Sequence, residues 1–140
     1  MAREGLWTKG RRRMPTPVEH WAEQARYDLD TARAMLESGR FLYVFFCCQQ
    51  ALEKMLKGLI VKRTLEFPPR LHNLSRLAEA AGLVPDEAKA DFLGELTAYY
   101  IQSHYPEAME ALGRDVSAET AAATLRKTEE VLEWLKSLLP

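Results

Sequence analysis

Two groups of side chains in this sequence have the chemistry that a nucleotide or single-stranded RNA requires. The first group lies on one polar stripe of a predicted helix and consists of Gln50, Glu53, Lys54 and Lys57. The second lies near the end of a later helix and consists of Tyr99, Tyr100, His104 and Tyr105. Lysines supply positive charge for phosphate, aromatic rings stack on bases, and Gln or Glu contacts polar edges. The alternative is structural: Glu53 and Lys57 form an ordinary i,i+4 helix pair, and the tyrosines belong to the core.

The common catalytic and ligand motifs are missing from the sequence. It has no Gly-rich phosphate loop, no His-Glu-x-x-His or paired-Cys metal spacing, and no Gly-x-Ser-x-Gly turn. The three histidines, His20, His72 and His104, are far apart along the chain. We therefore expect no catalytic residues, no metal site and no cofactor.

Five predicted helices must position these side chains. The first begins at the capping box Thr16-Pro17-Val18-Glu19 and ends at Gly39, and the second runs from about Phe41 to Arg63. A short helix follows from His72 to Ala81, closed by Gly82, and the next begins near Pro85-Asp86 and stops at Pro106. Ser117 caps the last helix. No segment alternates with period two, so the sequence predicts an all-α, up-and-down four-helix bundle with one extra short helix, over residues 16–140.

Charge and hydropathy indicate where in the cell the protein is expected to lie. The net charge is −1, and five of the 19 Lys and Arg residues lie in a tail, residues 1–15, that we expect to be flexible. These cations are Arg3, Lys9, Arg11, Arg12 and Arg13. No apolar run has the length of a membrane span or the flanks of a secretory signal, which predicts a cytoplasmic protein without membrane contact. Cys47 and Cys48 are expected to be reduced, buried thiols.

Four segments resemble motifs of the HEPN family, the higher-eukaryote and prokaryote nucleotide-binding domain. CCQQALEKMLKGLI (47–60) is similar to the family's Gln-Gln-Ala-x-Glu-Lys-x-Leu-Lys helix. HWAEQARYDLDTARAMLESGRF (20–41) resembles its first helix, with Trp21, Ala25, Asp28 and Leu29 in place. PPRLHNLSRLAEAAGL (68–83) resembles its Pro-x-x-His segment, and YYIQSHYPEA (99–108) its Tyr-x-x-x-Arg-Tyr-Pro stretch. The match covers roughly residues 18–138 in the expected order.

The resemblance implies a helical domain that dimerises and often accompanies a minimal nucleotidyltransferase, with nucleotide as the proposed ligand. Carried onto this sequence, the nucleotide-binding candidates are Gln50, Glu53, Lys54, Lys57, His72, His104 and Tyr105. We therefore expect a non-catalytic protein that binds an ATP-like or GTP-like nucleotide or RNA, or serves a nucleotidyltransferase as its partner, as in a toxin–antitoxin pair. The alternatives are a metal-independent ribonuclease toxin and a purely structural helical homodimer.

Two departures from the family pattern affect these expectations. His104 stands where the relatives carry Arg, which removes a permanent cation and a bidentate phosphate contact. The ribonuclease members use an Arg-x4–6-His motif, and no Arg lies at that spacing before His104. The only pair with that spacing is Arg13 and His20, outside the place where the resemblance puts a site.

The first half of the second helix predicts an interface. It is apolar all the way round, so Phe41, Leu42 and Phe46 cannot all point into the same core as Val44 and Phe45. Pairing this surface with its copy about a two-fold axis would cover both chains, which predicts a homodimer. The rival is a monomer in which the tail, with Leu6 and Trp7, folds back over the same surface.

Overall fold

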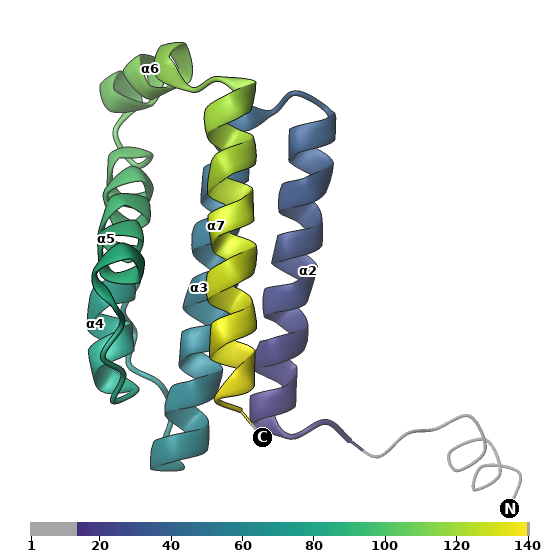
Figure 1. The fold of residues 1–140 in the computed structure, drawn as a ribbon, viewed down its shortest axis with the longest axis vertical. Coiled ribbons are helices and arrows are strands. Elements are labelled where there is room, and N and C mark those ends of the chain that lie inside the picture. The colour runs from purple at the N-terminus through teal and green to yellow at the C-terminus, as the bar shows by residue number, and fades with distance from the viewer. Residues whose placement is uncertain (1–13, 140) are drawn as a thin grey trace, which may run out of the picture.

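The computed structural model describes residues 14–139, and within them it contains six helices and no strand. The helices are α2 (Pro17–Glu37), α3 (Phe41–Thr64), α4 (Leu74–Ala80), α5 (Glu87–Gln102), α6 (Pro106–Asp115) and α7 (Ala118–Ser137). Four long helices run up and down, and the short helix α4 lies beside α5 (Figure 1). The predicted all-α bundle is confirmed. The basic tail and the fold-back of Leu6 and Trp7 lie outside the described residues.

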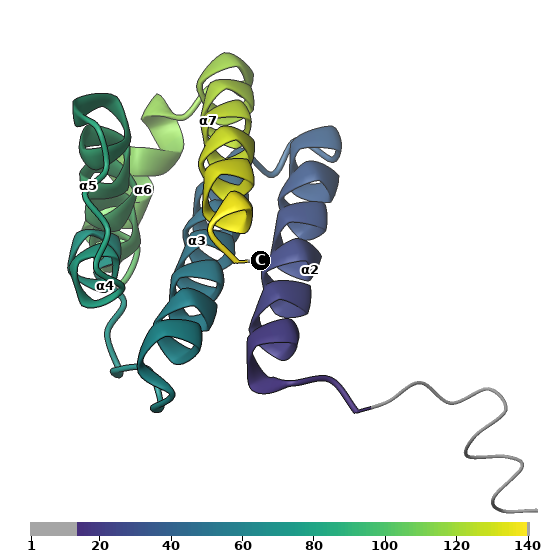
Figure 2. The same cartoon turned by 60° about the horizontal axis from the view of Figure 1, so that its bottom comes forward.

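Helix α3 occupies the centre of the molecule. Both views show α2 on one side of it, α4 and α5 on the other, and α7 alongside (Figures 1 and 2). Helix α6 lies across the end of the bundle where α5 finishes and α7 begins. Because helices surround α3 on several sides, its side chains meet several different environments around one helical turn.

Most helices begin or end at the residues that the sequence predicts, because the predicted capping residues are in place. Thr16, Asp86 and Ser117 each accept a hydrogen bond from the backbone amide three residues on, at 3.1, 2.9 and 3.1 Å. Gly39 and Gly82 adopt φ angles of 76° and 75°, which glycine tolerates without strain. The predicted start of the short helix at His72 is wrong, because Asn73 caps it and the helix begins at Leu74.

Helix α6 is absent from the sequence-based prediction. Pro106 was expected to stop the preceding helix, and it does follow the end of α5. The same proline occupies the first turn of α6, where its missing amide hydrogen costs no hydrogen bond. A proline therefore ends one helix and begins the next within a short stretch of chain.

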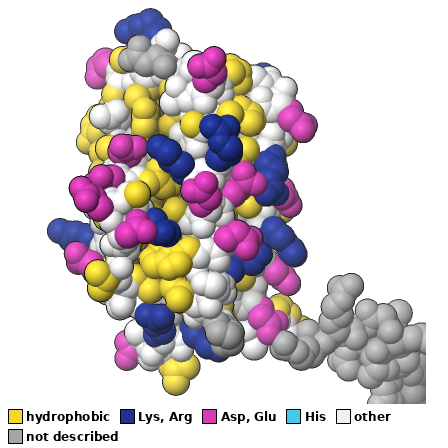
Figure 3. All heavy atoms as spheres, viewed as in Figure 1, with side chains coloured by type: hydrophobic (Ala, Val, Ile, Leu, Met, Phe, Trp, Pro, Cys, Tyr) yellow, Lys and Arg dark blue, Asp and Glu magenta, His cyan; other side chains and the backbone are white. Residues whose placement is uncertain are grey.

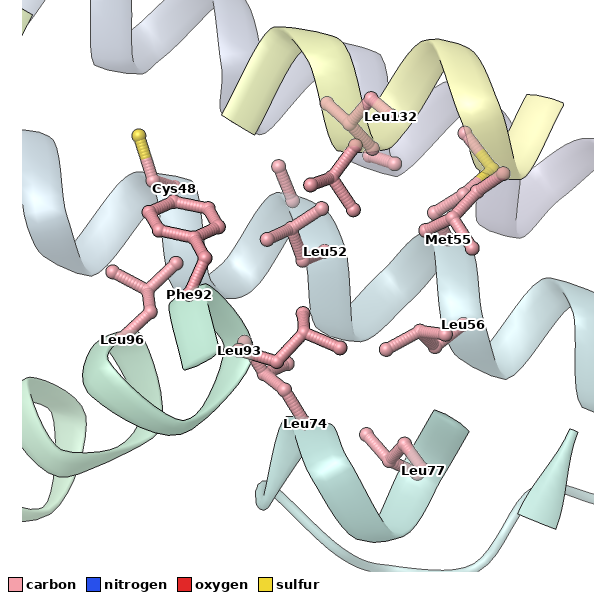
Figure 4. Close-up of a cluster of buried hydrophobic side chains, with 14 of the residues drawn as sticks. Cys48, Leu52, Met55, Leu56, Leu74, Leu77, Phe92, Leu93, Leu96 and Leu132 are labelled. Carbon is pink, nitrogen blue, oxygen red and sulfur yellow. The ribbon is translucent and has the colours of Figure 1, made fainter. Parts of the chain in front are cut away.

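The core is built around the leucines of α3. Leu52, Leu56 and Leu59 are fully buried and meet side chains from the surrounding helices (Figure 4). The partners include Leu74 and Leu77 of α4, Leu93 and Leu96 of α5, and Leu132 of α7. Burial of each such side chain contributes about 1.5–3 kcal/mol to folding.

Small residues let α2 approach α3 closely. Ala25 and Ala32 are the fully buried residues of α2, and an added Cβ at Gly58 of α3 would lie 3.1 Å from the Cβ of Trp21. This close packing positions one flank of α3 against α2. Within residues 14–139, no helix has the length and apolar character needed to cross a membrane.

Candidate functional site

A buried carboxylate, Glu53, lies at the centre of a polar cluster on α3. It is 5% exposed, and its Oε2 accepts a hydrogen bond from Lys57 Nζ at 3.0 Å. His72 Nδ1 lies 3.0 Å from Oε1 and 3.2 Å from Oε2. Because a carboxylate only accepts hydrogen bonds, His72 must carry a proton on Nδ1. The cluster therefore fixes the imidazole of an otherwise exposed histidine.

Gln49 supports this cluster, and the sequence-based list of candidates missed it. Its side chain is fully buried, and Nε2 donates to Glu53 Oε1 at 3.1 Å and to the carbonyl oxygen of His72 at 2.9 Å. Gln50 Nε2 in turn donates to Gln49 Oε1 at 2.8 Å. The signal in the sequence was a pair of adjacent glutamines in an apolar run, since a glutamine on the buried side needs polar partners. Gln49 ties the His72 loop to α3.

An aromatic surface adjoins the cluster and is centred on Tyr100. Its ring centroid lies 5.4 Å from that of His72 and 4.8 Å from that of His104. The Phe46 ring stacks against it at 6.1 Å with planes 18° apart. Burial, and then the charge of Glu53, raise the pKa of the Tyr100 hydroxyl. Residues from α3, the loop before α4 and the end of α5 thus meet at one place.

A small hollow borders this aromatic surface where α3, α5 and α6 meet. Its volume is about 220 Å³. It is lined by Leu42, Tyr43, Phe46, Ser103, His104 and Met109. Tyr43 and Phe46 are 53% and 42% exposed, so their rings are accessible to a ligand.

The two lysines of the predicted site are already engaged in ion pairs. Lys57 is 8% exposed, and its Nζ lies 5.9 Å from the centre of the Trp21 ring as well as beside Glu53. Lys54 Nζ lies 2.7 Å from Asp28 Oδ2, although the orientation leaves that buried oxygen without a directed hydrogen bond. The expectation that these lysines offer charge to phosphate is not supported by their surroundings.

The predicted site residues thus fall into two sets. Glu53, Lys57 and His72 are in direct contact, Gln50 joins them through Gln49, and His104 joins them through Tyr100. Two others lie apart from them. Lys54 faces α2, and Tyr105 is 60% exposed just before α6.

Tyr99 fits the structural alternative. Its ring lies 4.6 Å from that of Phe45, and it packs against the hydrophobic core.

Larger hollows lie elsewhere on the surface and are lined largely by charged side chains. One of about 560 Å³ lies between α2 and α7, with Ala22, Leu29 and Leu132 in its lining, and Arg33 of α2 pairs with Glu129 of α7 at 2.7 Å. Viewed from the α7 side, acidic and basic side chains alternate over the surface (Figure 3). The candidate site is therefore the Glu53–His72–Tyr100 cluster, defined here as Gln49, Glu53, Lys57, His72 and Tyr100.

The cysteines take no part in this site. Cys48 is fully buried, and burial raises the pKa of its thiol to about 12, so the thiol stays protonated and unreactive. Cys47 is only half-buried, which corrects the expectation that both side chains are buried; both are free. Among the residues described, no group of three or more His, Cys, Asp or Glu side chains is placed to hold a metal ion.

The architecture and the site together define a class of protein. It is a small helical bundle whose central helix carries a buried Gln-Gln-x-x-Glu cluster that anchors a histidine from the following loop. The family model of the HEPN domain matches residues 18–138, and the chain belongs to this family.

Two solved structures resemble the chain over nearly their whole length. TT1696 from Thermus thermophilus is 27% identical, with a TM-score of 0.73, over 88% of this chain and 98% of the other. ST0689, described as an archaeal HEPN homologue, is 26% identical with a TM-score of 0.70, over 90% of this chain and 100% of the other. No curated protein matches the sequence. Fold and family are thus established together.

Proposed function

We propose that this HEPN domain is a non-catalytic nucleotide-binding protein whose ligand contacts the Glu53–His72–Tyr100 cluster. One observation carries the proposal: a buried glutamate holds the exposed imidazole of His72 in one orientation beside the ring of Tyr100. A fixed donor or acceptor next to a stacking surface is what recognition of a base requires. The imidazole is 57% exposed, so its other edge is open to a ligand.

Titration calorimetry with ATP, GTP and a short RNA tests this proposal. His72→Ala should weaken binding at least about fivefold, because it removes a preorganised hydrogen-bonding group. The matched control is His20→Ala, which alters an exposed histidine that pairs with Gln24 on α2. If no ligand binds at about millimolar concentration, the proposal is wrong.

A ribonuclease remains the second candidate because two imidazoles flank Tyr100. His72 and His104 come from different elements and both contact its ring. A pair of imidazoles can remove and return a proton during phosphodiester cleavage. Labelled RNA incubated with the protein in a chelator decides the matter. Cleavage that persists in the chelator and disappears in His104→Ala would replace the non-catalytic proposal.

Self-association through the first half of α3 belongs to the same proposal. Phe46 is 42% exposed and Leu42 is half-buried, whereas Phe41 packs partly against the core. A homodimer would cover Phe46 and Leu42 in both chains. Light scattering at micromolar concentration should give twice the 16.0 kDa chain mass, and Phe46→Asp should give a monomer. A wild-type monomer would contradict the homodimer.

Association with a minimal nucleotidyltransferase, which the family resemblance implies, is part of the proposal too. A nucleotide bound at the exposed His72 side of the Glu53–His72–Tyr100 cluster would be accessible to such a partner. Purification from the native host at low salt, followed by mass spectrometry, should recover a nucleotidyltransferase in stoichiometric amount. Recovery of this chain alone would favour a self-contained function.

A further inference from the structure

The 220 Å³ hollow between α3, α5 and α6 suggests which part of a nucleotide this protein recognises. Resting on the proposed function, we propose that the hollow binds an unpaired nucleobase bearing an exocyclic amino group, with the phosphates left in solvent. The inference combines the size of the hollow, the charges around it and the hydrogen bonds already made by its lining residues.

Size limits the ligand to something like a single base. The volume is below the roughly 300–1,000 Å³ of pockets that enclose drug-sized ligands. A planar base can enter such a space, whereas a complete nucleoside triphosphate cannot. Tyr43 and Phe46 line the hollow with aromatic rings, which stack on any base.

The lining of the hollow carries no positive charge for phosphates. None of its six lining residues is Lys or Arg. Further along α3, Lys57 is buried against Glu53, and Lys54 is paired with Asp28. Releasing either lysine to bind phosphate would leave a carboxylate unpaired and largely buried, at a cost that offsets the new contact.

Hydrogen bonds already present determine which edge of a base fits. The carbonyl oxygen of Tyr100 accepts from Ser103 Oγ at 2.6 Å and faces His104 Nδ1 at 2.8 Å. Because a carbonyl only accepts, His104 carries a proton on Nδ1, and in the tautomer with that single ring proton Nε2 is an acceptor. Ser103 Oγ already donates its hydrogen to the Tyr100 carbonyl oxygen, so towards a ligand it can only accept. Two acceptors complement the exocyclic amino group of adenine, cytosine or guanine.

Titration with adenosine, inosine and ATP tests the inference, because inosine carries a carbonyl oxygen at position 6, and a proton on N1, where adenosine carries the exocyclic amino group and an unprotonated N1. We expect ATP to bind within about threefold of adenosine, with little change between low and moderate salt, because phosphates add few contacts. Inosine should bind at least about fivefold more weakly, since it loses one hydrogen bond and leaves an acceptor unpaired.

Matched variants locate the binding. Tyr43→Ala should weaken adenosine binding at least about fivefold, whereas Tyr27→Ala, at a 73% exposed tyrosine on α2, should not change it. Light scattering on both variants ensures that proteins of the same oligomeric state are compared. Leu42 and Phe46 line the hollow and also belong to the proposed dimer surface, so a base and a second copy of the chain would compete for them. Tyr43 is therefore the test position.

The outcomes separate this inference from the proposed function. ATP binding at least about tenfold tighter than adenosine and weakening with salt would overturn the inference and leave the proposed function standing. Equal binding of inosine and adenosine, or no effect of Tyr43→Ala, would also overturn it. If none of the three ligands binds, this inference fails, and the proposed function is then decided by the titrations with GTP and short RNA.

Discussion

The ion pair between Glu53 and Lys57 offers a direct test of how the site is built. The Glu53 side chain is 7% exposed and that of Lys57 is 10% exposed, so solvent screens the pair only weakly. Glu53→Gln keeps the shape of the side chain but leaves the ammonium group nearly buried without its partner. Breaking a buried pair in this way costs about 3–5 kcal/mol. We expect about 3 kcal/mol, the lower end, because the Trp21 ring 5.9 Å from Nζ still stabilises the cation.

Urea unfolding at pH 7 measures this loss, and a double-mutant cycle assigns it to the pair. Lys57→Met removes the charge while keeping much of the side-chain volume. If the charges interact, the double variant should lose at least about 2 kcal/mol less than the sum of the two single losses. The matched control is Arg114 and Glu110, an i,i+4 pair at 3.4 Å whose side chains are 68% and 77% exposed. Glu110→Gln should change the free energy of unfolding by less than about 0.5 kcal/mol.

One result would refute the reasoning. If Glu53→Gln costs less than about 1 kcal/mol and shows no coupling to Lys57, the pair behaves like a solvated surface pair. Glu53 would then not be the element that fixes His72, and the site as described would lose its centre.

Other predictions concern stability away from the site. Leu65 is 87% exposed and adopts φ 60° at the end of α3, so Leu65→Gly should raise the free energy of unfolding by about 1 kcal/mol in urea titrations. Gly94→Ala on α5, where an added Cβ meets nothing within 4 Å, should stabilise by about 0.5–1 kcal/mol, whereas Gly58→Ala should gain less because its Cβ meets Trp21 at 3.1 Å. The hydrogen bond from Lys89 lowers the pKa of Asp86, so its contribution is complete above about pH 4 and is lost as the pH falls further. Asp86→Asn should flatten this part of a plot of melting temperature against pH.

Much of the fold was predictable because it depends on local sequence. Thr16 and Ser117 cap their helices through contacts three residues away, and the apolar periodicity fixes which face of each long helix is buried. The missed helix α6 shows the limit of such signals. Pro106 has the same local chemistry whether it ends a helix or begins one, and the sequence does not say which applies.

Only part of the candidate site was predictable from the sequence: Glu53, Lys57 and His72 were among the predicted residues, whereas Gln49 was not. The sequence placed Glu53, Lys54 and Lys57 on one stripe, which the helical period requires. It could not show that α2 approaches one edge of that stripe, so that Asp28 pairs with Lys54. Nor could it show that the loop before α4 brings His72 to the other edge. Both contacts depend on how neighbouring helices are rotated about α3, which no local pattern records.

The position of α3 explains why one motif carries both structure and recognition. A helix surrounded on several sides has few exposed residues, so its polar side chains must find partners within the protein. Gln49, Glu53 and Lys57 do so, and through them the His72 loop is held to the core. Towards the start of the helix, Phe46 and Tyr43 remain accessible beside His104. The polar residues Gln49, Glu53 and Lys57 thus stabilise the structure, and the ligand is expected beside the aromatic residues near the start of α3. Variants that remove a charge should therefore change the free energy of unfolding, and variants of the aromatic residues should change ligand binding.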